Sequence, residues 1–356
     1  MLGSRSLRGR RAQWVSRRQW MTTVGGFLWW GCSQRVSGAR PNAGGDDLWL
    51  VNTRRITSSA LLANLDNPSL QFSRLDGDQQ YQPSSLIEFC DASTASPELP
   101  TVIYVHGNRF THQEAIERGW YIYQQVCRAR RGDNPWRFLV WSWPSEPSGL
   151  ILHDVRTKAQ RTDTQGLYLA WFLRNIASSS SSITLIGYSF GGRVVTGALH
   201  ALAGGSLGMR SIPNEPYEQL GAKVALIAAA IDANWLSPGR YHERAVKNTA
   251  SLTLMYNPQD SVLKRYWLLD RRDGSRALGV VGKLSLNLPV DASPIPVQSI
   301  NCNHIVGSRH NEIEYFSDHC RAGKILAELI ESDMPPKGHL PPKGQTPFRR
   351  GTEHHR

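Results

Sequence analysis

The residues best suited to chemistry lie in the stretch ITLIGYSFGGRVV, residues 183–195, where Ser189 stands among glycines and aromatic residues. The apolar, β-branched run before Ser189 predicts a buried strand, and residues 194–202 predict a helix. Glycines 187, 191 and 192 suit a backbone that turns sharply where no side chain fits. A G-x-S-x-G pattern between a strand and a helix predicts a nucleophile elbow, a strained turn that presents a serine hydroxyl. The alternative interpretation is an ordinary strand-to-helix turn.

A serine hydroxyl is a weak nucleophile unless a base accepts its proton and an acid orients that base. The oxyanion that develops on the substrate also needs hydrogen-bond donors. In chains with this elbow, the oxyanion loop precedes the serine, and the acid and then the histidine follow it. We expect these groups at the carboxyl ends of strands, where ligand sites of open α/β sheets lie.

The expected oxyanion loop is YVHGNRF, at the end of a predicted strand over 101–107. His106-Gly107-Asn108 resembles the HG-x loop of alpha/beta hydrolases. That resemblance implies that the backbone N–H groups of Asn108 and Phe190 form the oxyanion hole. We expect His106 to be structural, because it precedes the serine. A turn with a buried histidine is the alternative interpretation of this loop.

Two aspartates are candidates for the acid, Asp260 at the end of LTLMYNPQD and Asp232 at the end of ALIAAAID. Asp260 is favoured because the usual acid of this order follows the later strand, although both residues also suit turns and helix caps. The segment INCNHIVGSRHNEIEYF offers His304 and His310 as the base. His310 is favoured because it lies in a loop before the last predicted helix, whereas His304 lies close to the strand.

Strand-like and helix-like runs alternate along the chain. Continuous apolar strands separated by amphipathic helices predict a mostly parallel sheet with helices on both faces. The remaining expected strands cover residues 48–53, 86–89, 137–144, 223–232, 251–260 and 296–302. The expected helices cover residues 111–128, 155–176, 194–202 and 316–331, and residues 204–221 are expected to form a long connecting loop.

A family resemblance covers residues 48–332. The segments WLVNTRR, YVHGNRF, VWSWPS, LIGYSFGGRVV and NPQDSVL, followed by the late loop histidine, occur in the same order as in a group of poorly characterised, esterase- or lipase-like bacterial alpha/beta hydrolases. The resemblance implies the alpha/beta-hydrolase fold and hydrolysis of a small carboxylic ester, or a thioester, through an acyl-enzyme. Ser189, His310 and Asp260 would carry the reaction, and no metal or organic cofactor is expected.

The aromatic residues around the motifs predict an apolar substrate pocket. Trp141 and Trp143 fall in the SWPS region and are expected with Tyr188 near the site, where aromatics can line an acyl pocket. Packing in the core is the alternative for the tryptophans. Tyr188 and Phe190 flank the serine where the subgroup often has His and Met, so the resemblance does not define the shape of the pocket.

The net charge of +12 is concentrated at the two ends of the chain. Residues 1–40 contain eight arginines and no acidic residue, whereas residues 41–332 contain 28 basic and 27 acidic residues. A nucleic-acid-binding protein usually carries its positive charge on a folded face with a supporting motif. The near-neutral central part therefore argues against a nucleic-acid partner.

Residues 1–40 predict an export or lipoprotein-like signal. Arg17 and Arg18 precede an apolar stretch, residues 20–31, that is too short to span a bilayer. Gly31-Cys32 resembles the cleavage site of bacterial lipoproteins, in which the cysteine is lipidated. We therefore expect an exported or envelope-associated bacterial protein with a possible membrane anchor, and the alternative is a cytoplasmic one.

The last segment, residues 333–356, contains two PPKG units and little to bury, so it predicts a disordered tail. The domain organisation is then a signal over 1–40, a hydrolase domain over 48–332 and this tail. Because a fold does not guarantee chemistry, the alternative function is a catalytically inactive hydrolase-fold protein that acts as a membrane-associated binding module.

Overall fold

The computed structural model describes residues 45–76, 80–94, 99–270, 275–284, 295–317 and 320–332. The predictions for the signal at 1–40, including lipidation of Cys32, and for the tail at 333–356 lie outside these residues. Among the helices within the described ranges, none is both long enough and apolar enough to cross a membrane.

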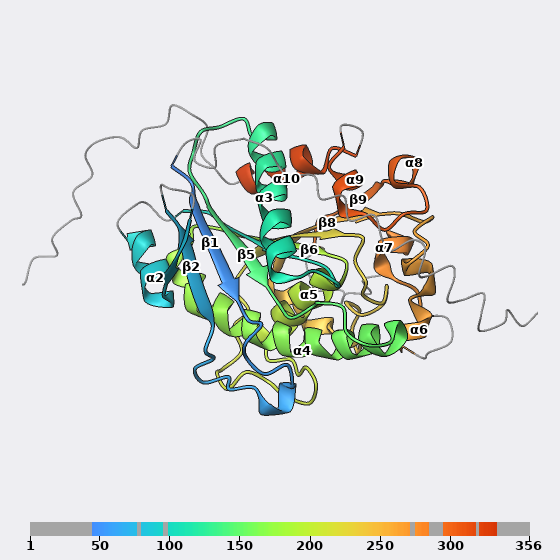
Figure 1. The fold of residues 1–356 in the computed structure, drawn as a ribbon, viewed down its shortest axis with the longest axis horizontal. Coiled ribbons are helices and arrows are strands. Elements are labelled where there is room, and N and C mark those ends of the chain that lie inside the picture. The colour runs from blue at the N-terminus through green and yellow to red at the C-terminus, as the bar shows by residue number, and fades with distance from the viewer. Residues whose placement is uncertain are drawn as a thin grey trace, which may run out of the picture. The chain divides into compact units, whose positions relative to one another are not determined.

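A sheet forms the centre of the described part of the chain (Figure 1). Its nine described strands follow the order β3-β2-β1-β5-β4-β6-β7-β8-β9, and neighbours from β1 to β9 run parallel. β2 and β3 add an antiparallel edge. The strands are β1 (Asp47–Asn52), β2 (Gln71–Leu75), β3 (Tyr81–Ser84), β4 (Thr101–Val105), β5 (Arg137–Ser142), β6 (Ile183–Tyr188), β7 (Ala222–Ile227), β8 (Thr249–Tyr256) and β9 (Val297–Asn301).

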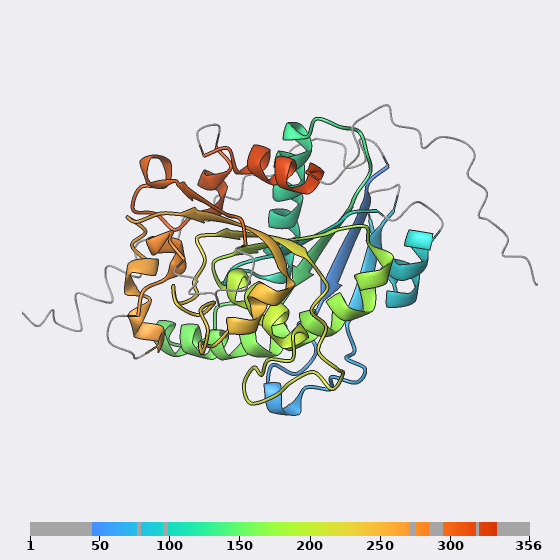
Figure 2. The same cartoon turned by 180° about the vertical axis from the view of Figure 1, so that it is seen from behind.

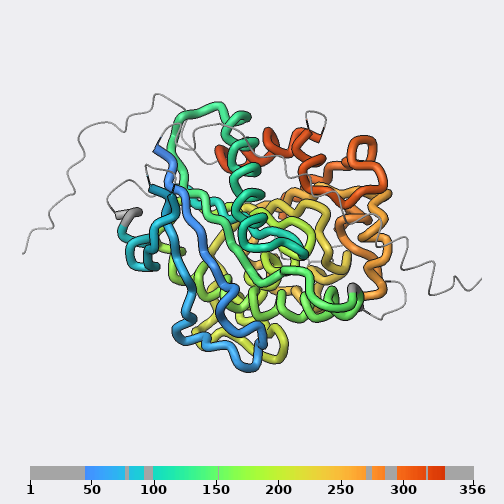
Figure 3. The backbone as a smooth tube through the Cα atoms, viewed as in Figure 1, coloured from blue at the N-terminus to red at the C-terminus, as the bar shows by residue number. Residues whose placement is uncertain are grey.

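Helices cover both faces of the sheet, which confirms the predicted layering. α3 (His112–Ala129) and α10 (Ala322–Glu331) lie on one face, and α4 (Ile151–Ile176) and α5 (Phe190–Leu202) lie on the other (Figures 1 and 2). In Figure 3 the last described helix, in red, lies beside the green α3. The shorter helices are α2 (Leu86–Thr94), α6 (Trp267–Asp270), α7 (Leu278–Val281), α8 (Asn303–Val306) and α9 (Glu312–Tyr315).

The predicted strand at 86–89 is wrong, because these residues begin α2. The Ser85 side chain accepts a hydrogen bond from the backbone N–H of Glu88, and such a serine cap favours a helix start over a strand. The edge strands β2 and β3 had no apolar run to reveal them, since their sequences are QFSRL and YQPS. The predicted last helix at 316–331 starts only at Ala322, after the left-handed residue Arg321.

The turn between β6 and α5 is tightly packed and places Ser189 at φ 50° and ψ −115°. A side chain other than glycine pays a steric cost in such a conformation. The glycines around Ser189 make the turn possible: a Cβ atom on Gly191 would lie 2.0 Å from the carbonyl oxygen of Val105 in β4. A Cβ atom on Gly187 would lie 2.8 Å from the backbone of Gly192. The elbow therefore depends on close backbone contacts that only glycine permits.

We predict that Gly191→Ala destabilises the protein by about 3 kcal/mol, because the added methyl group forces the first turn of α5 away from β4. Gly132→Ala is the matched control, since a Cβ atom at Gly132 would approach no atom closer than 3.7 Å. Urea denaturation measures both free energies of unfolding. Equal stability of the two variants would contradict the packing that we describe.

Candidate active site

Three side chains distant in the sequence form a hydrogen-bonded chain at the carboxyl edge of the sheet. The Nε2 atom of His310 lies 2.9 Å from Oγ of Ser189, and its Nδ1 atom lies 2.6 Å from Oδ2 of Asp260. Since an ionised carboxylate only accepts hydrogen bonds, Nδ1 carries the proton and Nε2 is left to accept one from the serine hydroxyl. The structure thus brings together the three residues that the sequence singled out for nucleophile, base and acid.

Asp260 is fixed by the turn that follows β8. Its side chain is buried, and Oδ1 accepts hydrogen bonds from the backbone N–H groups of Val262 and Leu263, both at 2.9 Å. This turn also contacts the segment before His310, because Ser261 donates its backbone N–H to the carbonyl of Ser308 at 3.0 Å. The acid and the histidine are consequently held by two loops that are bonded to each other.

The His310 ring is held from a second side by Tyr188, at the end of β6. The two rings stack with centroids 5.2 Å apart and an interplanar angle of 24°. Burial lowers the pKa of His310, but the charge and hydrogen bond of Asp260 and the charge of Glu312 outweigh burial, so the pKa is raised above its ordinary value. The surroundings therefore favour the imidazolium form of His310.

The rival candidates lie outside this group. His304 is exposed on α8. Asp232 accepts hydrogen bonds from the backbone N–H of Asn234 and from the hydroxyl of Ser275. Neither rival is hydrogen-bonded to Ser189 or His310, whereas His310 is hydrogen-bonded to both Ser189 and Asp260.

The loop after β4 lies against the serine turn. A Cβ atom on Gly107 would lie 3.3 Å from Cβ of Ser189, so the backbone of this loop approaches the serine closely. Phe190 is the first residue of α5, where a helix provides no acceptor for the N–H group. Within the described ranges, neither the N–H of Phe190 nor that of Asn108 has an acceptor. Neither predicted donor is therefore taken up by another group of the described residues.

The SWPS segment, residues 142–145, fastens this loop. Trp143 donates its backbone N–H to Nε2 of His106 at 3.1 Å and its indole N–H to the carbonyl of His106 at 2.8 Å. The two rings stack with centroids 5.6 Å apart. Ser145 adds two contacts, since its carbonyl accepts the N–H of Arg109 at 2.8 Å and its hydroxyl accepts the N–H of Phe110 at 3.1 Å. The segment thus positions the backbone that carries Asn108.

This arrangement corrects the predicted pocket. Trp141 and Trp143 are fully buried, and the indole N–H of Trp141 donates to Oε1 of Gln165 in α4 at 3.1 Å. A buried indole N–H needs such a partner, and both tryptophans find theirs in the interior. They therefore present no surface to a substrate, and only Tyr188, in contact with His310, remains beside the site.

His106 has the structural role that its place before the serine suggested. Burial, with the nearby charge of Arg54, lowers its pKa to about 3, so the ring is neutral near pH 7. Nδ1 lies 2.8 Å from the carbonyl of Gly107, to which it donates, and Nε2 accepts from Trp143. Both ring nitrogens are thus engaged in holding the loop.

Arg54, just beyond β1, has a role in the site that the sequence did not predict. Its guanidinium donates to Oγ of Ser142 at 2.9 Å and to the carbonyl of Phe110 at 3.2 Å, and it pairs with Glu146. It therefore ties the loop after β4 to the SWPS segment. An arginine directly after a buried strand, in WLVNTRR, was the only signal for this role.

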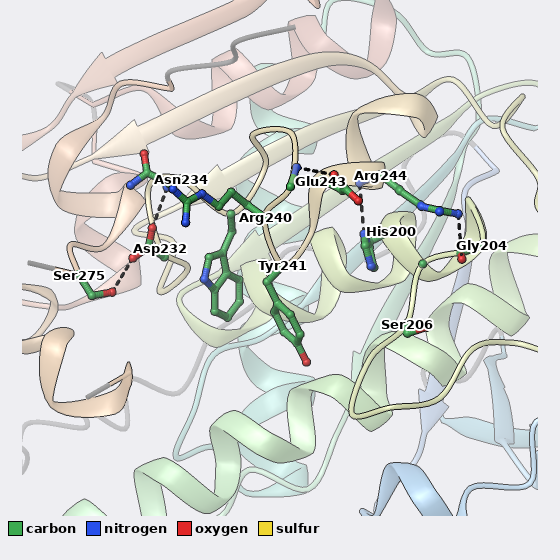
Figure 4. A pocket seen from close by; sticks show the side chains of 13 residues that line it. His200, Gly204, Ser206, Asp232, Asn234, Arg240, Tyr241, Glu243, Arg244 and Ser275 are labelled. Atoms are coloured by element: carbon green, nitrogen blue, oxygen red, sulfur yellow. Dashed lines mark hydrogen bonds between the residues drawn. The ribbon is translucent and has the colours of Figure 1, made fainter. Parts of the chain in front are cut away.

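A cavity of about 630 Å³ lies away from Ser189 (Figure 4). Most of its lining comes from the connection between β7 and β8, including Trp235. Tyr241 lies between Asp232 on one side and Ser206 on the other (Figure 4). Asp232 lines this cavity, whereas Ser189 and His310 do not. In the described part of the chain, no group of three His, Cys, Asp or Glu side chains is arranged to hold a metal ion.

Residues 88–280, more than half of the chain, match the family described as "Alpha/beta hydrolase of unknown function (DUF900)". The chain belongs to this family. The match includes the loop after β4, the SWPS segment, the serine elbow and Asp260, and it ends before His310. The fold is accordingly the alpha/beta-hydrolase fold that the sequence predicted.

Two solved structures are remotely similar to this chain. The poly(3-hydroxybutyrate) depolymerase LpqC from Bordetella parapertussis has 14% sequence identity and a TM-score of 0.37, over 68% of this chain and 82% of that one. Esterase B from Lactobacillus rhamnosis, in an inhibited form, has 15% identity and a TM-score of 0.32, over 82% and 91%. A search of curated proteins finds no match.

We predict that Trp143→Phe costs about 1–3 kcal/mol of folding free energy, because it leaves the buried carbonyl of His106 without its donor. Trp267→Phe is the matched control, since that side chain is 53% exposed, and its effect should stay within about 0.5 kcal/mol. Urea denaturation distinguishes the two. A Trp143→Phe variant as stable as the control would show that the segment does not fasten the loop.

Proposed function

We propose that the protein is a serine hydrolase that cleaves a small carboxylic ester, or a thioester, through an acyl-enzyme on Ser189. The proposal rests on one observation, the hydrogen-bonded chain from Ser189 through His310 to Asp260. A serine, a histidine and a carboxylate in this arrangement are the parts that nucleophilic acyl transfer requires. Membership of an alpha/beta-hydrolase family supports the same reaction class.

The reaction begins when Nε2 of His310 takes the proton from Oγ of Ser189 as this oxygen attacks the substrate carbonyl carbon. Asp260 keeps the ring in the tautomer with hydrogen on Nδ1 and stabilises the imidazolium that forms. The backbone N–H groups of Asn108 and Phe190 donate to the oxyanion of the tetrahedral intermediate. These N–H groups support catalysis because the backbone already holds them in position, so they need not reorient as negative charge develops on the substrate oxygen.

Collapse of the intermediate breaks the bond to the alcohol or thiol, which leaves with the proton from His310. The acyl group is then bonded to Ser189. His310 next takes a proton from water, whose oxygen attacks the acyl carbon, and the same N–H groups bind the second oxyanion. Collapse of this second intermediate releases the carboxylic acid as His310 returns the proton to Oγ of Ser189, so each cycle consumes one ester and one water molecule.

We predict that Ser189→Ala, His310→Ala and Asp260→Asn each lower kcat/KM for a p-nitrophenyl butyrate substrate by on the order of 10³-fold or more, because each removes one member of the chain. His304→Ala and Asp232→Asn are the matched controls and should retain activity near that of the wild type. The measurement is the initial rate of p-nitrophenol release.

A fluorophosphonate probe provides the independent readout. It should label the wild-type protein and both control variants, and it should not label Ser189→Ala. A folded wild-type protein that hydrolyses none of a panel of esters and thioesters and accepts no probe would contradict the proposal and favour a binding role.

We also propose, from the sequence alone, that the protein is exported and anchored to a bacterial membrane through lipidated Cys32. In a bacterial host, radiolabelled palmitate should then appear on the protein, which should sediment with membranes. Cys32→Ser should abolish both properties and Cys90→Ser neither. Equal labelling and sedimentation of all three proteins would contradict the anchor.

A further inference from the structure

A second buried carboxylate lies close to the site and has no part in the reaction just described. Glu312 is the first residue of α9, two positions after His310, and only 1% of its surface is exposed. The hydroxyl of Tyr104, on β4, donates to it and lies 3.0 Å from each carboxylate oxygen. Nε of Arg118, on α3, lies 3.6 Å from Oε2.

Tyr104 holds the Glu312 carboxylate in place, but Arg118 neutralises its charge only weakly. The Arg118–Glu312 separation is longer than that of a charge-assisted hydrogen bond, and the NH1 atom of Arg118 is buried without a partner among the described residues. A buried carboxylate costs desolvation free energy that such a pair repays only partly. A buried carboxylate two residues from a reactive histidine is therefore a candidate for a role in the site.

The charge of Glu312 acts on the site from the side of α9. It contributes to raising the pKa of His310, after the larger effects of burial, which lowers that pKa, and of Asp260, which raises it. It also helps to raise the pKa of Tyr188, whose ring stacks on His310, although burial is the larger cause there. Asp260 already occupies Nδ1 of His310, so Glu312 adds charge without competing for that hydrogen bond.

We propose that Glu312 is a positioning residue for His310: its negative charge, held in place by Tyr104 and Arg118, stabilises the imidazolium that forms when His310 takes the proton of Ser189. The proposal rests on the function proposed above for Ser189 and His310. Glu312 accepts no proton in the reaction and contacts no reacting atom. Its contribution is the field of a second carboxylate at the moment when positive charge appears on the ring.

This role makes activity depend on the ionisation of Glu312. Burial raises the pKa of Glu312 to about 7, although Arg118, the Tyr104 hydroxyl and His310 all act to lower it. As the pH falls through this range, Glu312 takes up a proton and its support for the imidazolium is lost. The protonation of Glu312 is therefore coupled to that of His310, and the two apparent pKa values describe the pair rather than either residue alone.

Among the described residues, two other charged groups act on this pair. Asp260 faces His310 from the loop after β8, and Arg118 faces Glu312 from α3. Burial raises the pKa values of the neighbouring tyrosines, so they stay neutral in the range where Glu312 and His310 titrate; these are Tyr104, Tyr121, Tyr188 and Tyr315. A change in the titration of His310 on removal of the Glu312 charge is accordingly attributable to that charge.

The first test follows the His310 ring by NMR in the full chain carrying Ser189→Ala, so that the result does not depend on catalysis. Histidine labelled in the ring reports the titration midpoint, and a His310→Gln variant assigns the signal. Glu312→Gln should move the midpoint of His310 down by about half a pH unit or more, because a nearby negative charge is lost. Glu314→Gln, on the same short helix and paired with Arg309, should leave it unchanged.

The second test is the pH profile of ester hydrolysis in chains that keep Ser189. In Glu312→Gln the rising limb of kcat/KM should move to lower pH, and kcat at the plateau should fall by about fivefold or more with little change in KM. Tyr104→Phe removes a hydrogen bond that favours the ionised form of Glu312, so it should move the His310 midpoint in the same direction by less. If Glu312→Gln does not fold, Tyr104→Phe replaces it in both tests.

An unmoved His310 midpoint in folded Glu312→Gln, or equal shifts in Glu312→Gln and Glu314→Gln, would overturn the proposal. Failure of the proposed function is a separate result, because it appears as absence of probe labelling and of ester hydrolysis in the wild-type protein. The NMR titration still decides in that case whether Glu312 controls the protonation of His310.

Discussion

The close approach of α5 to the sheet is the constraint on which the rest of the site depends. The first turn of α5 lies against the carbonyl of Val105, where even a methyl group on Gly191 would meet the oxygen at 2.0 Å. This contact fixes Ser189 in its strained conformation at the end of β6 and sets the N–H of Phe190 beside it. The loop after β4 approaches the same turn through Gly107, so one compact junction of backbone orders both the serine and the expected oxyanion donors.

Around this junction, hydrogen bonds connect the loops that carry the site residues in two pairs. On one side, Trp143, Ser145 and Arg54 fasten the backbone on either side of Asn108, and the neutral ring of His106 lies at the centre of their hydrogen bonds. On the other side, the turn that carries Asp260 is bonded to the segment before His310. Buried side chains outside the hydrogen-bonded chain of Ser189, His310 and Asp260 thus help to determine where these three residues lie, as a preorganised site requires.

The sequence predicted the parts of the molecule that depend on local pattern. Apolar runs predicted the parallel strands, and glycine spacing with strand order predicted which serine, aspartate and histidine meet. Trp141 and Trp143 were misread because a tryptophan beside a site and one in the core look alike in a sequence, and only the partners of the indole N–H separate them. Arg54 and Glu312 could not be assigned, because their roles arise from contacts with β4, α3 and loops distant in the chain.

The most direct test of the account is to trap the intermediate that it requires. The wild-type protein would be mixed with p-nitrophenyl butyrate, quenched in acid within the burst of product release, digested, and analysed by mass spectrometry. We expect a butyryl group on the peptide that contains Ser189, and none on that peptide from His310→Ala under the same conditions. Hydrolysis that proceeds with no acyl group on Ser189, or with the group on another residue, would show that Ser189 is not the nucleophile.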